Sequence, residues 1–185
     1  MTRRVARIPP LSTDNEASAD LFGNVLKHDG RVLNAASTLA HHPRLLKRFT
    51  VFAGLFLTHS VLPERDRELI TLRCAHRFES EYYFGHHVIL AADVLTPDEI
   101  ARTVRSNEEW SGFDRRLLDA VDELADSADL SDETWSDLSA HYDDPQLLDL
   151  VMLVGFYRMT CLYVNTIRVE REPGVPGWPS ERTQQ

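Results

Sequence analysis

The sequence predicts an all-α fold, a single multi-helix bundle, on the strength of three observations. Apolar residues recur at three- and four-residue spacing along several segments, which is the period of a helix with one buried face. Helix-capping residues and prolines stand directly before these segments, where helices begin. No segment of useful length alternates apolar and polar residues as a strand does, and no internal repeat of fixed period is present.

The expected helices follow an extended lead-in that ends in two prolines at residues 9–10. A first helix should run through residues 21–26 and end at the Asp29–Gly30 pair. A proline follows His42 at an early position of a later helix, where it is tolerated because the first turn needs no backbone donor. Further helices are expected over residues 32–39, 43–59, 64–78, 80–94, from 96 onward, 114–125, from 131 onward and 144–169.

The clearest helix start lies at Thr96. Pro97 takes the first helical position, and Glu99 stands where its carboxylate completes a capping box with Thr96. Three prolines and two glycines fall within residues 173–179. We therefore expect one helical domain over residues 1–172 and a tail over residues 173–185.

Composition limits the classes of partner. The 185 residues suit one domain, and 29 acidic against 20 basic residues give a net charge of −9, which argues against nucleic acid or an anionic membrane as partner. No run of about eighteen apolar residues indicates a spanning helix. The N-terminus lacks the pattern of a signal peptide, so a cytoplasmic location is expected. Cys74 and Cys161 form no CxxC pair, which disfavours a disulfide scaffold or zinc site.

The candidate chemistry lies between Glu68 and His87. Ser80, Tyr83 and His87 share one face of a helix, within about 60° of one another. Glu68 lies on the preceding helix, and the short joint between the two helices favours their packing together. A carboxylate that orients an imidazole is a general acid/base arrangement. The same spacing also fits a solvated glutamate and a structural histidine.

Other polar residues are weaker candidates. The adjacent pairs His41–His42 and His86–His87 diverge on a helix and have no third ligand at useful spacing, so no metal site is expected. Ser80 lacks the context of a catalytic serine and is placed to cap a helix. Cys74 points away from Glu68, and core packing is its expected role.

The order of these residues resembles a known motif. Glu68, eleven residues, Ser80, two residues, Tyr83, three residues and His87 resemble the site of the carboxymuconolactone decarboxylase and alkylhydroperoxidase D family, whose peroxidase members carry cysteines at the positions of Ser80 and Tyr83. Further stretches also resemble the family: residues 7–11, 30–34, 38–43, 62–69 and 155–157, and Asn165.

The resemblance implies a helical bundle of the alkylhydroperoxidase D type that forms a homo-oligomer, a dimer, trimer or hexamer, and needs no cofactor. Thiol peroxidase chemistry needs a thiolate and a resolving thiol, which Ser80 and Tyr83 cannot supply. The resemblance to the cysteine-free decarboxylase branch implies instead a cofactor-independent lyase or isomerase acting on a small organic acid or lactone. Glu68 and His87 would act as its acid/base pair, with Tyr83 as a catalytic proton donor.

Two further residues are candidates for substrate binding, and one of them, Arg158, departs from the family pattern, in which Asn is common at this position. Ser80 would line the pocket, and Arg158 would either hold a substrate carboxylate or pair with an acidic residue across a subunit interface. Two other functions stay open: a peroxide reductase that uses Cys74 or Cys161, and a non-catalytic binding or scaffold protein that kept the fold.

Overall fold

The computed structural model describes residues 5–12, 22, 23, 25 and 27–179, so the helix expected through residues 21–26 lies largely outside the described residues. The chain forms two compact units. The described residues up to His59, together with Val164–Gly174, form the first unit. Ser60–Tyr163 and the residues from Val175 onward form the second unit, which holds every candidate site residue.

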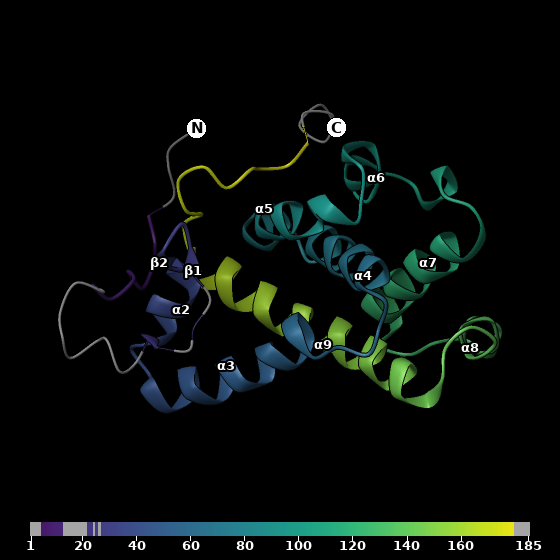
Figure 1. Ribbon diagram of the computed structural model, residues 1–185, viewed down its shortest axis with the longest axis horizontal. Coiled ribbons are helices and arrows are strands. Elements are labelled where there is room, and N and C mark those ends of the chain that lie inside the picture. The colour runs from purple at the N-terminus through teal and green to yellow at the C-terminus, as the bar shows by residue number, and fades with distance from the viewer. Residues whose placement is uncertain (1–4, 13–21, 24, 26, 180–185) are drawn as a thin grey trace. The chain divides into compact units, whose positions relative to one another are not determined.

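The described elements are almost all helices, so the predicted all-α fold is confirmed (Figure 1). Their boundaries agree with the predicted ones to within a few residues for most helices. The described elements are β1 (Lys27–His28), β2 (Arg31–Val32), α2 (Asn34–Leu39), α3 (Pro43–Thr58), α4 (Glu64–Arg77), α5 (Glu81–Leu90), η1 (Ala91–Asp93), α6 (Pro97–Arg102), η2 (Asn107–Glu109), α7 (Gly112–Ser127), α8 (Asp132–Ser139) and α9 (Asp144–Ile167).

Two boundaries differ from the prediction. Asp29 and Gly30 both have positive φ angles, 48° and 76°, and they form the tight turn of a small antiparallel hairpin in which Lys27 pairs with Val32. Such a turn matches the twist of paired strands, so Val32 belongs to a strand and the next helix begins at Asn34. The predicted fifth helix ends at Leu90, and its last turn tightens into the 3₁₀ turn η1.

The helix pair α4–α5 carries the candidate residues. Helix α4 packs against both α5 and α7, and its residues from Glu68 to Ala75 are all buried. The chain turns at Glu79, whose φ of 54° is left-handed. Ser80 then caps α5, because its Oγ accepts a hydrogen bond from the backbone N–H of Tyr83 at 3.4 Å. The tight joint predicted from the sequence therefore brings the two helices face to face.

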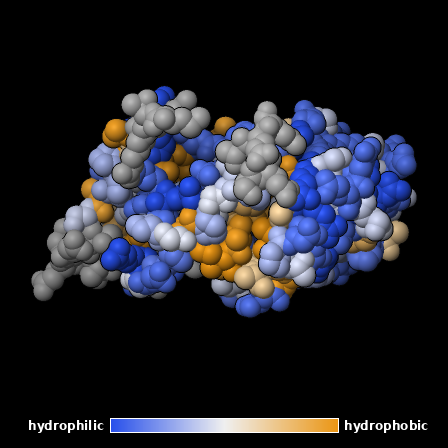
Figure 2. Space-filling model, turned by 90° about the horizontal axis from the view of Figure 1, so that it is seen from above, coloured by the Kyte–Doolittle hydropathy of each residue, from blue (hydrophilic) through white to orange (hydrophobic). Residues whose placement is uncertain are grey.

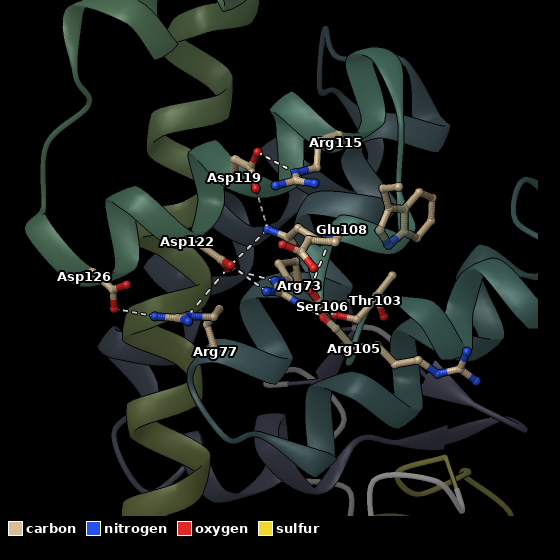
Figure 3. A network of polar contacts seen from close by, with 12 residues as sticks. Arg73, Arg77, Thr103, Arg105, Ser106, Glu108, Arg115, Asp119, Asp122 and Asp126 are labelled. Atoms are coloured by element: carbon tan, nitrogen blue, oxygen red, sulfur yellow. Dashed lines mark hydrogen bonds and ion pairs between the residues drawn. The ribbon is translucent and has the colours of Figure 1, made fainter.

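A buried arginine fixes α4 against α7 (Figure 3). The guanidinium of Arg73 donates to both carboxylate oxygens of Asp122, at 2.8 and 2.5 Å, and to the backbone carbonyls of Thr103 and Arg105. Asn107, at the start of η2, also donates to Asp122, at 3.0 Å. Each nitrogen of the Arg73 guanidinium thus has an acceptor, as a buried charge requires.

The outer face of α5 is covered by the segment Val175–Trp178. A Cβ atom built on Gly85 would lie 2.1 Å from the carbonyl oxygen of Pro176, so only glycine permits this approach. The backbone N–H of Trp178 donates to Glu81 at 3.1 Å, and its ring packs on Phe84. The Trp178 ring also lies edge-on to His76 of α4, so this segment contacts both helices of the pair. The predicted domain boundary at residue 172 stays a prediction.

Among the described residues, one helix, α9, has the length and apolar composition of a membrane-spanning helix. Half of its most apolar window is buried inside the protein, as in the core helix of a globular domain. Its buried face includes Leu150, Leu153 and Tyr157. On the face drawn in Figure 2, a group of hydrophobic residues lies near the centre, and smaller hydrophobic spots lie among the hydrophilic residues elsewhere.

Candidate active site

Glu68 and His87 meet between α4 and α5. Glu68 is fully buried, and its Oε2 atom lies 2.7 Å from Nδ1 of His87, which is also buried. An ionised carboxylate can only accept hydrogen bonds, so Nδ1–H of the imidazole donates to it. The structure thus brings together the two residues that the sequence analysis singled out as an acid/base pair.

Tyr157 of α9 completes the arrangement. Its hydroxyl lies 2.7 Å from Nε2 of His87 and is buried. Both ring nitrogens of His87 are therefore engaged, one by Glu68 and the other by Tyr157. In the neutral imidazole, Nδ1–H donates to Glu68 and Nε2 accepts from the Tyr157 hydroxyl, which makes a continuous chain from carboxylate to phenol.

Arg67 supports the carboxylate from its other side. Its Nε and Nη2 atoms donate to Oε1 of Glu68 at 3.2 and 3.0 Å, and Nη2 also donates to Glu64 at 3.2 Å. Each oxygen of Glu68 therefore has its own partner, Arg67 on Oε1 and His87 on Oε2. A buried charge that is paired on both oxygens is far less costly than an isolated one.

The environment fixes the protonation of the two ends of this chain. Burial acts to raise the pKa of Glu68, but the neighbouring His87 and Arg67 outweigh it, and the net pKa lies below its usual range. Burial, the charge of Glu68 and the nearby Tyr83 raise the pKa of Tyr157 well above its usual range. Near neutral pH Glu68 is thus ionised, and Tyr157 holds its proton.

Tyr83 lies on the solvent side of the hydrogen-bonded chain formed by Glu68, His87 and Tyr157. Its ring packs edge-on against the Tyr157 ring, with centroids 5.8 Å apart, and its side chain is half-buried. Glu68, His87 and Tyr157 are themselves buried, so Tyr83 is the member of the cluster closest to solvent. The structure thus places Tyr83 beside Tyr157.

Ser80 occupies the start of α5, inside the protein. It is fully buried, its Oγ caps the helix, and it hydrogen-bonds the thiol of Cys161. Its described contacts therefore explain a structural role. The proposal that Ser80 also binds substrate stays a prediction.

Arg158 contacts a different region from its neighbour Tyr157. Its guanidinium lies over the Phe78 ring, 5.6 Å from the centroid, and reaches the Ala125 carbonyl at 3.5 Å. These partners lie at the C-terminal ends of α4 and α7, where a cation is favoured by the helix dipoles. Successive residues of a helix point about 100° apart, so Arg158 and the buried Tyr157 face different surroundings.

Both cysteines are buried and reduced in this structure. Burial raises the pKa of Cys161 to about 12 and that of Cys74 well above its usual range, so neither forms a thiolate readily. No cluster of three or more His, Cys, Asp or Glu side chains that could hold a metal occurs among the residues the structure describes.

Sequence reasoning missed Tyr157 and Arg67 as site residues. Tyr157 lies 70 positions after His87, and only the packing of α9 against α4 and α5 shows that its hydroxyl reaches the imidazole. Arg67 directly precedes Glu68, but neighbouring residues on a helix normally diverge, so spacing gave no reason to pair them.

Comparison with curated proteins shows one partial similarity, and no family model matches the chain. A sestrin homolog from Dictyostelium discoideum is 31% identical over 78 residues, which is 42% of this chain. The match covers 13% of that protein, so this chain corresponds to a small part of its length.

Solved structures show the fold more completely. An uncharacterized peroxidase-related protein from Silicibacter sp. TM1040 superposes with a TM-score of 0.81 at 18% identity, covering 96% of this chain and 98% of that one. An alkylhydroperoxidase AhpD core protein from Ralstonia eutropha JMP134 gives 0.76 at 20% identity, over 90% and 93% of the two chains. The debrominase Bmp8 gives 0.70 at 14% identity, over 90% and 92%.

These likenesses identify the fold. The chain has the alkylhydroperoxidase D-like fold, which it shares with peroxidase-related proteins and a debrominase. The resemblance inferred from the motif around Glu68 and His87 is thereby confirmed at the level of fold.

Proposed function

We propose that this protein is a cofactor-independent proton-transfer enzyme, a lyase or isomerase that acts on a small organic acid or lactone. The observation that carries the proposal is the double engagement of His87, by Glu68 on Nδ1 and by Tyr157 on Nε2, each at 2.7 Å. A buried imidazole with an ionised carboxylate behind it and a phenol in front is organised to move a proton. A protein that only had to maintain the fold would not need this chain of hydrogen bonds.

Tyr157 is the member of the chain that meets substrate in this proposal. When its oxygen accepts a proton from a substrate carbon, its own proton passes to Nε2 of His87, and the imidazolium that forms is stabilised by the Glu68 carboxylate. The reverse transfer returns a proton to another carbon, which completes an isomerisation without any oxidant. Tyr83, half-buried against Tyr157, is placed to hydrogen-bond the substrate at the outer side.

The same chain of hydrogen bonds can also supply the proton that a decarboxylation needs. Loss of CO2 leaves an electron pair on carbon, and a proton delivered from the imidazolium of His87 through Tyr157 completes the product. Water then restores the proton, so that one carboxylate and one proton give CO2 and a new C–H bond. The low pKa of Glu68 keeps the carboxylate ionised and able to hold the imidazolium.

Thiol-dependent peroxide reduction is the competing function, because two neighbours of the same fold are described as peroxidase-related or as an alkylhydroperoxidase core. The raised pKa values of the buried Cys74 and Cys161 disfavour it. Titration of the two thiols with an alkyl hydroperoxide discriminates: a peroxidase would form a sulfenate quickly, whereas we expect slow reaction at both cysteines.

The proposal is tested by proton exchange, which needs no knowledge of the final product. Wild-type protein is incubated in D2O with a panel of small lactones, cyclic keto acids, dicarboxylic acids and halogenated pyrroles, the last because Bmp8 is a debrominase crystallised in complex with 2,3,4-tribromopyrrole. Loss of a C–H signal by NMR identifies a substrate. We expect His87→Ala and Glu68→Ala to abolish the exchange.

Two outcomes would overturn the proposal. Exchange or turnover that survives in His87→Ala and Glu68→Ala would place the chemistry elsewhere. No exchange with any compound, together with no ligand that stabilises the wild type in a thermal-shift screen, would instead support the non-catalytic scaffold reading.

A further inference from the structure

We propose that Thr71 is a positioning residue of the site, whose hydroxyl donates a hydrogen bond to the Tyr157 oxygen as that phenol gives its proton to His87. The inference rests on the proposed proton-transfer function and adds the group that stabilises the phenol while charge develops on it. Three observations carry it: the burial of Thr71 without a hydrogen-bond partner, the face of α4 on which it lies, and its position beside Tyr157.

The Thr71 hydroxyl is a buried polar group without an ordinary partner. Thr71 is fully buried in α4, and its Oγ1 atom makes no hydrogen bond to the residues that the structure describes. A buried hydroxyl left unpaired is unfavourable and uncommon in native proteins, so each one calls for an explanation. Packing does not supply it, because valine has the same shape and would fill the space without an unpaired hydroxyl.

Hydroxyl groups on helices usually find an acceptor on their own helix, in the carbonyl four residues before them. Four side chains on other helices of this chain donate in this way: Thr50, Thr58, Ser127 and Ser139. Thr71 makes no such bond to the carbonyl of Arg67. Its proton can therefore be donated to a group on another helix.

Thr71 faces the candidate site. It follows Glu68 by three residues on α4, which puts the two side chains about 60° apart on one face of the helix. Glu68 reaches His87 from this face. The Thr71 hydroxyl lies close to the phenol of Tyr157, outside ordinary hydrogen-bond geometry. Helix α4 thus supplies both the carboxylate behind the imidazole and a hydroxyl beside the phenol.

The effect of Thr71 on Tyr157 opposes that of other groups around the phenol. Burial raises the pKa of Tyr157 most, and Glu68 and Tyr83 raise it further. The Thr71 hydroxyl acts to lower this pKa, because a donor stabilises a phenolate more than a phenol. Thr71 therefore favours the charge that the proposed transfer creates.

The phenol needs this donor during the transfer. In the resting state the Tyr157 hydroxyl donates to Nε2 of His87 at 2.7 Å. When that proton moves to Nε2, negative charge develops on the phenol oxygen until the substrate proton arrives. A donor that is already in place stabilises such a charge without reorganisation of the site. Thr71 keeps its own proton throughout, so its hydrogen bond strengthens and no further covalent bond forms or breaks.

Thr38 provides a matched control. It is also buried, at 4% exposure, and its Oγ1 atom also lacks a hydrogen-bond partner among the described residues. It lies on α2 in the first compact unit, whereas the candidate site lies in the second. Replacing either threonine with valine exchanges an unpaired hydroxyl for a methyl group of similar size, so neither variant should have a lower Tm than the wild type.

Deuterium exchange measures the role of Thr71, with whichever lactone, keto acid or dicarboxylic acid of the panel the wild type exchanges. Thr71→Val should slow the exchange roughly 10- to 100-fold, the factor that corresponds to one hydrogen bond to a charged group. Thr71→Ser restores the hydroxyl and should recover most of the rate. Thr38→Val should exchange at the wild-type rate.

A double-mutant cycle with Tyr157→Phe tests whether Thr71 acts through the phenol. The phenylalanine variant has no oxygen to stabilise, so adding Thr71→Val to it should leave its residual exchange unchanged. A residue that only shaped the fold would slow the exchange by the same factor in both backgrounds.

Four results would overturn this inference and leave the proposed function in place. They are a Thr71→Val variant as fast as the wild type, a Thr71→Ser variant as slow as Thr71→Val, a Tm that falls together with the rate, and equal slowing in both backgrounds of the cycle. In each case His87→Ala and Glu68→Ala would still abolish the exchange. A wild type that exchanges no proton of any compound would overturn both proposals, so the two failures are distinguishable.

Discussion

Replacing Tyr157 with phenylalanine removes one oxygen atom and separates the chemical role of the site from its structural role. The change breaks the 2.7 Å hydrogen bond between the phenol and Nε2 of His87. An intact hydrogen bond contributes about 1 kcal/mol net, but removing one partner and leaving the buried acceptor unsatisfied costs about 1–3 kcal/mol. We therefore expect the variant to lose about 2 kcal/mol of the free energy of unfolding.

The matched control is Tyr142→Phe. The Tyr142 hydroxyl donates to Oδ2 of Asp66 at 2.6 Å, is also buried and takes no part in the proposed site. Its bond to a carboxylate is worth about 1.5–3 kcal/mol, so this variant should lose a similar amount of stability. Loss of a general acid/base group lowers a rate by about 10²–10⁴-fold, an effect expected for Tyr157→Phe alone.

Urea unfolding followed by circular dichroism measures the stability of both variants, and deuterium exchange into a substrate measures the rate. Either of two results would refute the reasoning. The first is a Tyr157→Phe variant whose stability matches the wild type within about 0.5 kcal/mol, which is the ordinary effect of a surface substitution. The second is a Tyr157→Phe variant that exchanges protons as fast as Tyr142→Phe.

Three further changes test other parts of the structure. The folded-state pKa of Glu68 lies below its usual value of 4.5, so near that pH the folded state binds fewer protons than the unfolded state. The wild type should therefore be more stable than Glu68→Gln above about pH 4.5, and this difference should shrink as the pH falls further. Urea unfolding of both proteins at several pH values measures the difference. Gly85→Ala should cost about 1–3 kcal/mol because its Cβ meets the Pro176 carbonyl, whereas Gly54→Ala on α3, where a Cβ meets nothing, should be neutral or stabilising by up to about 1 kcal/mol; equal thermal shifts for the two would contradict this. Arg73→Met should cost about 3–5 kcal/mol because it removes the buried cation that pairs with Asp122 and the donor of two backbone carbonyls. A loss below about 1 kcal/mol in chemical denaturation would argue against the buried network of Figure 3.

Helix positions were predictable because they depend on local features. The capping box at Thr96 is present in the structure, where Glu99 accepts from Thr96 N–H at 2.8 Å and donates its own N–H to Thr96 Oγ1 at 3.2 Å. The hairpin turn was missed because the Asp29–Gly30 pair signals both the end of a helix and a tight turn between strands. Two strands of two residues each carry no period that a sequence can reveal.

The candidate site was predictable in part for the same reason. Glu68 and His87 lie on two helices joined by a short turn, so local geometry was enough to bring them close. Tyr157 lies on a helix distant in the sequence, and its contact with His87 depends on how α9 packs, which spacing does not specify. Arg158 was predictable as a cation, but its direction depends on Phe78 and Ala125, which are its partners in the folded chain.

The most direct test of the chain from Glu68 through His87 to Tyr157 is nitrogen NMR of protein labelled with ¹⁵N-histidine, with the His87 signals assigned from a His87→Gln variant. For the neutral ring the structure predicts a proton on Nδ1, held by Glu68, and an unprotonated Nε2 whose signal shifts in Tyr157→Phe. A proton on Nε2 of the neutral ring, or a Nε2 signal indifferent to Tyr157→Phe, would contradict the relay on which the proposed function rests.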